Sequence, residues 1–142
     1  MGIRSMIKVT AAILIDNSKL LIARRAAGQH LAYLWELPGG KVEPGETPEA
    51  CLKREMYEEF SIKVKVEEFF CSSVYNYDMK QIELLAYFVH WVSGKIVPTV
   101  HDEIKWVTLN DFDQYNFAPA DIPIINKLVN DWPRHFKFGG LS

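Results

Sequence analysis

The chain has 142 residues, of which 49% are hydrophobic and 13% aromatic. This composition excludes a disordered protein, and the length suits one domain with a buried core. The formal net charge of −2 excludes a general attraction to the nucleic-acid backbone or to an anionic membrane surface. We therefore expect no nucleic-acid polymer and no membrane as partner, and any phosphate group must bind at a local site.

The cysteines and the two ends of the chain bear on where the protein is located and on how many domains it has. Cys51 and Cys71 form no CxxC pair and lack metal-ligand spacing, so free thiols in a cytoplasmic protein are expected. The start lacks the apolar stretch and the cleavage site of a signal peptide. We expect residues 1–5 to be a cloning remnant or a flexible start, residues 6–132 to form one domain, and residues 133–142 to form a tail.

The first part of the chain is expected to form two strands joined by a turn. β-branched and apolar residues favour strands over 6–15 and 19–23, with turn-forming residues at 16–18 between them. We expect an irregular segment over 24–33 and then a short strand over 34–37.

A helix is predicted in the middle of the chain. The Pro-Gly-Gly run at 38–40 is expected to break regular structure and to let the backbone approach another group closely. Thr47 is a suitable N-cap and Pro48 suits the first helical position, so a helix is predicted over 48–60. The remaining predicted elements are strands over 64–77, 81–92 and 104–108 and a helix over 121–131. Strands with one inserted and one closing helix favour an α/β fold with a mixed sheet between helices.

Three glutamates on the predicted middle helix are candidates for binding a cation. Glu55, Glu58 and Glu59 stand at i, i+3 and i+4, so their carboxylates share one face. Such like-charge pairs destabilise a helix by roughly 0.2–0.5 kcal/mol each unless a partner neutralises them. A hard divalent cation suits oxygen ligands, whereas a solvated acidic face is the simpler explanation for three glutamates alone. The glycine-bearing loop upstream, Glu46 and Arg54 favour the cation.

These residues resemble the Nudix box, G-x5-E-x7-R-E-U-x-E-E-x-G-U, in which U is a bulky aliphatic residue. Eight of its nine specified positions match: Gly40, Glu46, Arg54, Glu55, Met56, Glu58, Glu59 and Ile62. Ser61 stands in place of the last glycine, which normally ends the helix in a left-handed conformation, and costs some cap stability. The resemblance implies a Nudix-like α/β/α sandwich with a central mixed sheet, and Mg²⁺ as cofactor with Mn²⁺ as a substitute.

The same resemblance implies roles for the box residues. The metal ligands would be Glu55, Glu58 and Glu59, with the Gly39 carbonyl as a further one. Arg54 would orient the acids, and Glu46 would support the loop and helix. Either Glu55 or Glu59 would be the general base, and the spacing does not decide between them.

Two segments outside the box, residues 24–40 and 117–124, are similar to MutT-type 8-oxo-dGTP diphosphatases and to bacterial CTP pyrophosphohydrolases. From this resemblance, Arg25 would bind phosphate or ribose, and Glu36 and Leu37 would line a base pocket. Lys80 falls near a basic position of the MutT pattern, although a solvated lysine at a hairpin tip explains it more simply.

Asp121 would read the base edge, where MutT-type enzymes carry asparagine. An ionised carboxylate only accepts hydrogen bonds, so Asp121 suits a base edge that presents donors. A plain helix N-cap is the alternative role, and the two are compatible. Relatives also carry a metal-binding glutamate about six residues before Trp106, where this chain has Val100. We expect Glu103 to take that place, although ordinary surface charge also explains it.

The resemblance implies a Mg²⁺-dependent nucleoside triphosphate pyrophosphohydrolase that releases nucleoside monophosphate and pyrophosphate. Modified nucleotides such as 8-oxo-dGTP, or cytidine nucleotides, would be the substrates, with a role in nucleotide-pool sanitation and DNA repair. The alternatives are hydrolysis of ADP-ribose or dinucleoside polyphosphates, and a catalytically inactive nucleotide-binding Nudix module. We expect a monomer or a homodimer.

Overall fold

The computed structural model describes residues 5–135 of the chain. One helix is inserted between four strands and three further strands, and two helices close this part of the chain. None of its helices has both the length and the apolar character of a membrane span. The elements in chain order are β1 (Ser5–Asp16), β2 (Lys19–Arg25), β3 (Trp35–Glu36), β4 (Gly39–Lys41), α1 (Pro48–Phe60), β5 (Lys63–Tyr77), β6 (Lys80–Ser93), β7 (His101–Val107), the 3-10 helix η1 (Leu109–Gln114) and α2 (Ile122–His135).

The sheet is mixed and is centred on β1. This strand pairs in parallel with β6, from Ser5 opposite Lys80 to Leu14 opposite Val89. Antiparallel pairs extend the sheet on both sides: β5 joins β6, β2 joins β1, and β3 and β7 both join β2. The short β4 pairs antiparallel with β1 and carries the glycine pair into the sheet.

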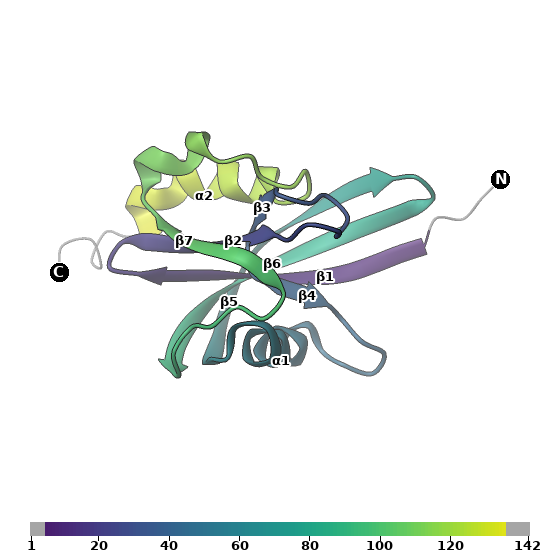
Figure 1. Cartoon of the computed structure of the whole chain (residues 1–142), viewed down its shortest axis with the longest axis horizontal. Helices are drawn as coiled ribbons and strands as arrows, with labels where there is room; N and C mark the ends of the chain where they lie inside the picture. The colour runs from purple at the N-terminus through teal and green to yellow at the C-terminus, as the bar shows by residue number, and fades with distance from the viewer. Residues whose placement is uncertain (1–4, 136–142) are drawn as a thin grey trace.

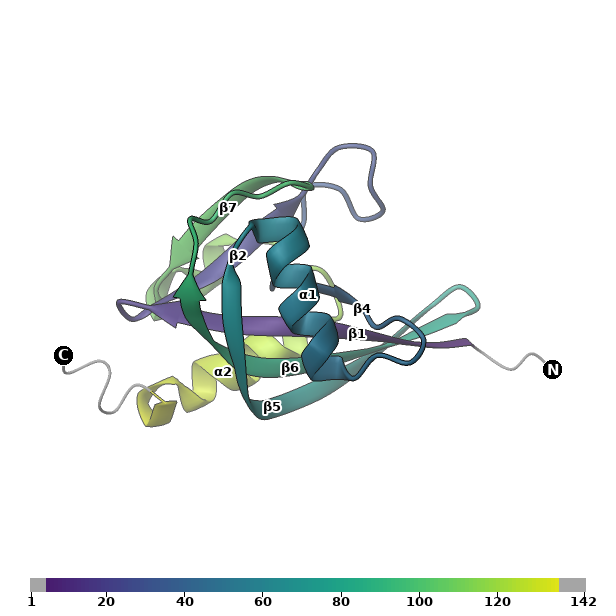
Figure 2. The same ribbon diagram turned by 90° about the horizontal axis from the view of Figure 1, so that it is seen from below.

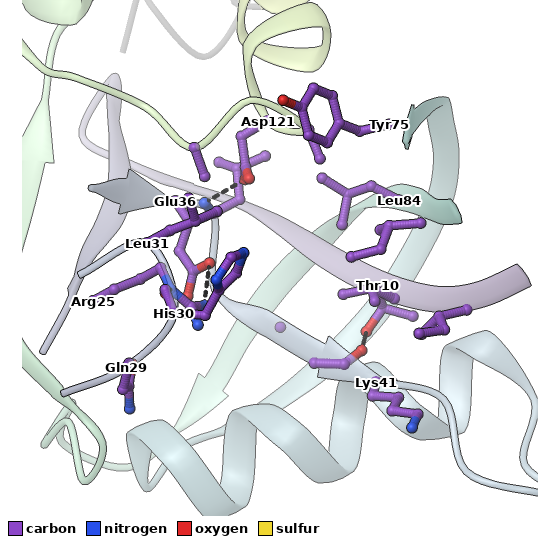
Figure 3. Close-up of a pocket in the computed structure, with 18 of the residues that line it drawn as sticks. Thr10, Arg25, Gln29, His30, Leu31, Glu36, Lys41, Tyr75, Leu84 and Asp121 are labelled. Atoms are coloured by element: carbon purple, nitrogen blue, oxygen red, sulfur yellow. Dashed lines mark hydrogen bonds and ion pairs between the residues drawn. The ribbon is translucent and has the colours of Figure 1, made fainter. Parts of the chain in front are cut away.

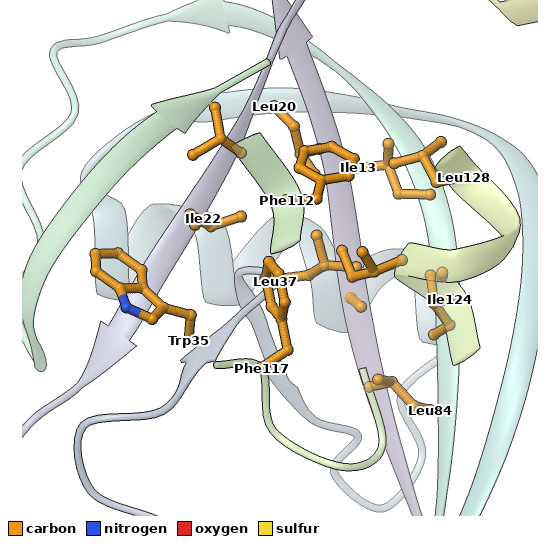
Figure 4. Close-up of a cluster of buried hydrophobic side chains, with 14 of the residues drawn as sticks. Ile13, Leu20, Ile22, Trp35, Leu37, Leu84, Phe112, Phe117, Ile124 and Leu128 are labelled. Carbon is orange, nitrogen blue, oxygen red and sulfur yellow. The ribbon is translucent and has the colours of Figure 1, made fainter. Parts of the chain in front are cut away.

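One helix covers each face of this sheet, with α2 above and α1 below in Figure 1, and α1 in front in Figure 2. Side chains on β1 alternate between the two faces because successive residues of a strand point to opposite sides. The α1 core contains Ala12, Leu14, Leu21, Ala23, Leu52, Met56, Phe60, Ile62, Val64, Tyr87 and Val89. The α2 core contains Ala11, Ile13, Leu20, Ile22, Trp35, Leu37, Leu84, Ala86, Val107, Phe112, Phe117, Ile124, Ile125, Leu128 and Trp132 (Figure 4). The predicted α/β/α sandwich with a mixed sheet is therefore confirmed.

Some boundaries differ from the prediction. The glycine pair was expected to break regular structure, yet β4 forms because β1 supplies a partner. The last strand begins at His101, three residues before the predicted start, because β7 stays paired with β2 as far as Arg25. Helix α2 runs to His135, past the predicted end, and η1 was not predicted. Cys51 and Cys71 are both free thiols, as expected.

Candidate active site

A cavity of about 510 Å³ opens on the side of the sheet where β4 and α1 meet the loops around residues 26–34 and 117–121. Arg25, Glu36 and Asp121 lie on one side of it, and Tyr75 and Leu84 lie on the other (Figure 3). This volume falls within the range of small-molecule sites, and the lining combines apolar walls with a few charged groups.

The glycine pair brings the glutamate helix against the cavity. A Cβ added at Gly40 would lie 2.3 Å from the carboxyl carbon of Glu55, so only glycine lets this carboxylate approach the β4 backbone. A Cβ at Gly39 would lie 1.9 Å from the carbonyl oxygen of Thr10 on β1. The Thr10 hydroxyl donates to the Gly40 carbonyl at 3.2 Å and fixes β4 further. Close approach to the β1 backbone therefore requires Gly39, whereas a side chain at position 40 would displace the Glu55 carboxylate from its place.

Arg54 ties the loop before α1 to the acids on it. Its Nε and Nη2 donate to the two oxygens of Glu46 at 2.7 and 2.9 Å. Its Nη1 donates to Glu58 at 3.0 Å and to Glu55 at 3.2 Å. Because it accepts from Arg54, and also from the Glu43 N–H, Glu46 has a pKa lowered to about 2. The pKa of Arg54 is raised, chiefly by the same hydrogen bond, so this pair stays ionised.

Glu59 lines the cavity, and the neighbouring carboxylates disfavour a negative charge on it. Burial raises its pKa to about 8, and the charge of Glu55 and a shared hydrogen bond with Glu55 act in the same direction. Glu55 is itself only 8% exposed. Two adjacent carboxyl groups in this environment hold a proton that a hard cation could replace, since Mg²⁺ takes oxygen ligands. The donor chemistry therefore fits a divalent ion, although no three acidic, histidine or cysteine side chains within residues 5–135 already form a closed ligand set.

The end of α1 is held by a strap, residues 94–100, that leads into the cavity wall. Ser61 has φ +64° and ends the helix in the left-handed conformation, as the position in the box requires. The Thr99 N–H donates to the Glu59 carbonyl at 2.9 Å, and the Thr99 hydroxyl donates to the Glu58 carbonyl at 3.1 Å. The strap therefore satisfies carbonyl groups that a helix terminus leaves without partners.

Asp121 occupies the opposite end of the cavity and is 5% exposed. Its Oδ2 accepts from the Leu37 N–H at 2.9 Å, while the first backbone bond of α2 runs from the Ile125 N–H to its carbonyl. Burial, and then the charge of Glu36, raise its pKa well above the ordinary value. The Ser73 hydroxyl donates to the carbonyl of Ala120 and fixes this loop to β5.

Between the two ends stands Glu36, held from two sides. Its Oε1 lies 3.1 Å from Arg25 Nη1, and its Oε2 lies 2.8 Å from His101 Nε2. The Nε of Arg25 also donates to the His30 carbonyl at 2.6 Å, which ties the loop over the cavity to β2.

The other predicted site residues are less central. Lys80 is exposed at the rim, and Val100 lines the wall. Glu103 is not part of the lining: it lies opposite Arg24 in the sheet, with its carboxylate 3.7 Å from Arg24 and 3.6 Å from Lys105. The structure thus does not bring Glu103 to the glutamate helix.

The cavity is also lined by three residues that were not predicted, namely Tyr75, Ile82 and Leu84. The alternation of Ile82 and Leu84 along β6 puts them on one face, which could have indicated a common wall. His101 was not among the predicted site residues, because its place in β7 depends on pairing with β2.

The chain is similar to known proteins over most of its length. The profile of the NUDIX domain matches residues 6–128. The chain belongs to the Nudix family. A CTP pyrophosphohydrolase of Escherichia coli K12 is 38% identical to this Nudix hydrolase over 87% of the chain and 92% of the relative. An 8-oxo-dGTP diphosphatase of Haemophilus influenzae is 33% identical over 90% of the chain and 95% of the relative.

Solved structures agree on the fold. The solution structure of the Escherichia coli ORF135 protein has a TM-score of 0.81 and 34% identity to this Nudix hydrolase, covering 92% of this chain and 94% of that one. A MutT protein from Methanosarcina mazei also has a TM-score of 0.81, with 22% identity, over 92% of this chain and 97% of that one, and supports the fold alone.

Proposed function

We propose that this Nudix hydrolase is a Mg²⁺-dependent nucleoside triphosphate pyrophosphohydrolase that acts on modified or cytidine nucleotides. In this reaction the oxygen of water bonds to a phosphorus of the triphosphate chain and a bridging P–O bond breaks. One water is consumed, and nucleoside monophosphate and pyrophosphate are released. We further propose that this serves nucleotide-pool sanitation in the cytoplasm.

One observation carries the proposal: a single cavity runs from the glutamate helix to a buried aspartate. Glu59, Gly39 and Gly40 line one end, and Asp121 lines the other. A triphosphate needs a cation and carboxylates that hold this cation. A base needs apolar walls and a buried polar group that forms hydrogen bonds with its edge. The cavity offers both in the order in which a nucleotide presents phosphates and base.

The residues at the phosphate end have distinct tasks. Glu55, Glu58, Glu59 and the Gly39 carbonyl would hold Mg²⁺, which when bound polarises phosphoryl oxygens and neutralises developing charge. Arg54 keeps Glu55 and Glu58 oriented through its hydrogen bonds. Glu55 or Glu59 would take the proton of the attacking water, and Arg25 at the cavity edge would contact phosphate or ribose.

The state of Asp121 bears on base selection. An ionised Asp121 would only accept hydrogen bonds, but the raised pKa of this carboxyl favours the protonated acid. A protonated carboxyl whose Oδ2 accepts from Leu37 N–H can donate through its other oxygen, as an amide donates through its NH₂. This supports base edges that present an acceptor as well as those that present donors. Cytosine and oxidised guanine are both compatible with it, and similarity to a CTP pyrophosphohydrolase and to 8-oxo-dGTP diphosphatases supports the same pair.

The other candidates have weaker support. A Streptococcus suis ADP-ribose pyrophosphatase shares the fold at 14% identity and a TM-score of 0.69, which says nothing about substrate. An inactive binding module would not need Glu55, Glu58 and Glu59 together with the Arg54 network.

The test is a product-release assay with Mg²⁺ on 8-oxo-dGTP, dGTP, CTP, 5-hydroxy-dCTP, ADP-ribose and a diadenosine polyphosphate. We expect an oxidised or cytidine triphosphate to be preferred, with monophosphate and pyrophosphate as products. Glu59→Gln should lower kcat by at least about 100-fold because a metal ligand or base is lost. Glu67→Gln, an exposed glutamate on β5, is the matched control.

Two results would contradict the proposal. One is turnover of no triphosphate above background; the other is equal activity of Glu59→Gln and the wild type. A third variant, Asp121→Ala, should change base preference more than the Mg²⁺ requirement, because alanine offers neither a donor nor an acceptor to the base. An unchanged preference would remove Asp121 from base reading.

A further inference from the structure

His101 is a buried histidine in the cavity wall whose role the proposed reaction does not define. Its side chain is 3% exposed, and it opens β7 opposite Arg25. Its ring stacks on Phe60, the last residue of α1, with centroids 5.1 Å apart and planes 25° apart. Its Nε2 lies 2.8 Å from Glu36 Oε2. The residue therefore joins the end of the glutamate helix to the carboxylate in the middle of the cavity.

The surroundings of the ring select its donor. The Nδ1 atom is buried and has no hydrogen-bond partner among residues 5–135. The carboxylate of Glu36 only accepts hydrogen bonds, so the Nε2 nitrogen, 2.8 Å from Oε2, carries a proton and donates to it.

This hydrogen bond and the Arg25 ion pair leave Glu36 in one orientation. One oxygen accepts from Arg25 and the other accepts from His101. A carboxylate offers about four lone-pair sites, so each oxygen keeps acceptor capacity. The side chain is 19% exposed and lines the cavity, so that capacity is available to a ligand.

Glu36 also has a defined place along the cavity. Its partner His101 stacks on Phe60, which follows Glu59 on α1. The residue after Glu36 is Leu37, whose N–H donates to Asp121 at 2.9 Å. Glu36 therefore lies between the two ends. A nucleotide with its phosphates at Glu59 and its base at Asp121 brings its sugar beside Glu36. Sugar hydroxyls are donors, and an acidic side chain that accepts from a ribose hydroxyl is a recurrent arrangement.

We propose that Glu36 accepts a hydrogen bond from a sugar hydroxyl of the nucleotide, and that His101 is the positioning residue that orients Glu36 for it. This inference rests on the proposed function for the direction in which the nucleotide lies. Glu36 would then recognise the sugar, in addition to the residues that bind the base and the phosphates.

The first measurement compares a substrate with and without sugar hydroxyls. We expect kcat/KM for CTP or dCTP to exceed that for 2′,3′-dideoxy-CTP by about 10- to 100-fold, the factor expected of one hydrogen bond to a charged group. Glu36→Gln should reduce this ratio to within about threefold of unity, because the amide turns a donor toward either Arg25 or His101 and removes the charge. An equal preference in the wild type would overturn the sugar contact.

Two substitutions of His101 separate positioning from packing. His101→Gln keeps an N–H donor for Glu36 but loses the ring, whereas His101→Phe keeps a ring for Phe60 but loses the donor. We expect His101→Gln to retain the sugar preference within about threefold and His101→Phe to lose most of it. The reverse order would show that packing alone is needed and would overturn the positioning role. Asp102→Asn is the matched control, since Asp102 pairs with Arg24 and does not line the cavity.

A binding measurement keeps this inference separate from the proposed reaction. Titration calorimetry with CMP, dCMP and 2′,3′-dideoxy-CMP in the presence of EDTA requires neither metal nor turnover. We expect the dideoxy compound to bind about tenfold more weakly to the wild type, and equally to Glu36→Gln. If no triphosphate is hydrolysed but this difference remains, the proposed function fails and the sugar contact stands. Equal binding of the three compounds to the wild type would overturn the contact even in an active enzyme.

Discussion

At the scale of residues, the parts of the site differ in how far apart they lie in the chain. Glu46, Arg54 and the three glutamates fall within one loop and one helix, so local spacing predicted that they would lie together. The contact between Glu36 and His101 spans 65 positions and depends on how β2 pairs with β3 and β7. No local pattern in the sequence predicts such a contact. For the same reason, the pairing of Glu103 with Arg24 was not predicted.

Glu59 gives a prediction about pH. A carboxyl whose folded pKa is raised to about 8 holds a proton that the unfolded chain has already lost. The folded, metal-free protein therefore loses stability as pH rises from about 4.5 to about 8. Mg²⁺ must displace this proton, so its apparent affinity should rise by up to about tenfold per pH unit below pH 8 and then level off.

Calorimetric Mg²⁺ titrations between pH 6 and about 9 check this expectation, with proton release measured in buffers of different ionisation enthalpy. Glu59→Gln should bind Mg²⁺ more weakly and with little change across that range, whereas Glu67→Gln should behave as the wild type does. An affinity for the wild type that stays constant with pH would contradict the assignment of Glu59 as the protonated ligand.

At the scale of elements, α1 shows why some boundaries are predictable and others are not. Thr47 accepts from the Ala50 N–H, Pro48 occupies the first turn, and Ser61 ends the helix, so sequence and structure agree on residues 48–60. These signals act within a few residues of the boundary. Strand β4 has no such signal, because two glycines disfavour a strand. These residues form a strand only because they pair with β1. The start of β7 is set in the same way by β2.

Ser61 gives a prediction for the end of α1. A left-handed residue other than glycine is strained by roughly 1–2 kcal/mol, part of which is offset because glycine has more freedom in the unfolded chain. The Ser61 hydroxyl recovers a little through its bond to the Val97 carbonyl at 3.3 Å. We expect Ser61→Gly to exceed Ser61→Ala in free energy of unfolding by about 1 kcal/mol.

Urea unfolding followed by circular dichroism measures both variants beside the wild type. The alanine variant is the matched control because it keeps the Cβ, and thus the strain, while it removes the hydroxyl. Alanine and glycine variants of equal stability would show that the position of Ser61 is not strained.

At the scale of the whole molecule, the sheet separates two cores, and each supports one end of the cavity. The α1 core seats the helix that carries Glu55 and Glu59, and the α2 core seats the helix that follows Asp121. The order of strands and helices predicted a sheet between helices, and the apolar residues at successive positions of β1 and β2 fit strands that are covered on both faces. The direction of the cavity across the sheet was not predictable, since it arises from loops that close over β1 and β6.

This division leads to a prediction on a matched pair of variants. Leu52 on α1 and Leu128 on α2 are both fully buried, so Leu52→Ala and Leu128→Ala should each lower the free energy of unfolding by about 2–5 kcal/mol. Their effects on function should differ, because loosening α1 displaces the carboxylates that hold Mg²⁺, while loosening α2 displaces Asp121. Leu52→Ala should raise the Mg²⁺ concentration needed for half-maximal activity several-fold with little change in base preference. Leu128→Ala should do the reverse.

Steady-state kinetics at a temperature where both variants remain folded would separate the two effects, with Leu52→Met and Leu128→Met as volume-conserving controls. Suppose instead that both alanine variants changed the Mg²⁺ requirement and the base preference in proportion to their loss of stability. The two ends of the cavity would then respond to global stability alone, and the sheet would not separate them. Independent effects would mean that the phosphate end and the base end can be altered one at a time, because each rests on its own layer of the sandwich.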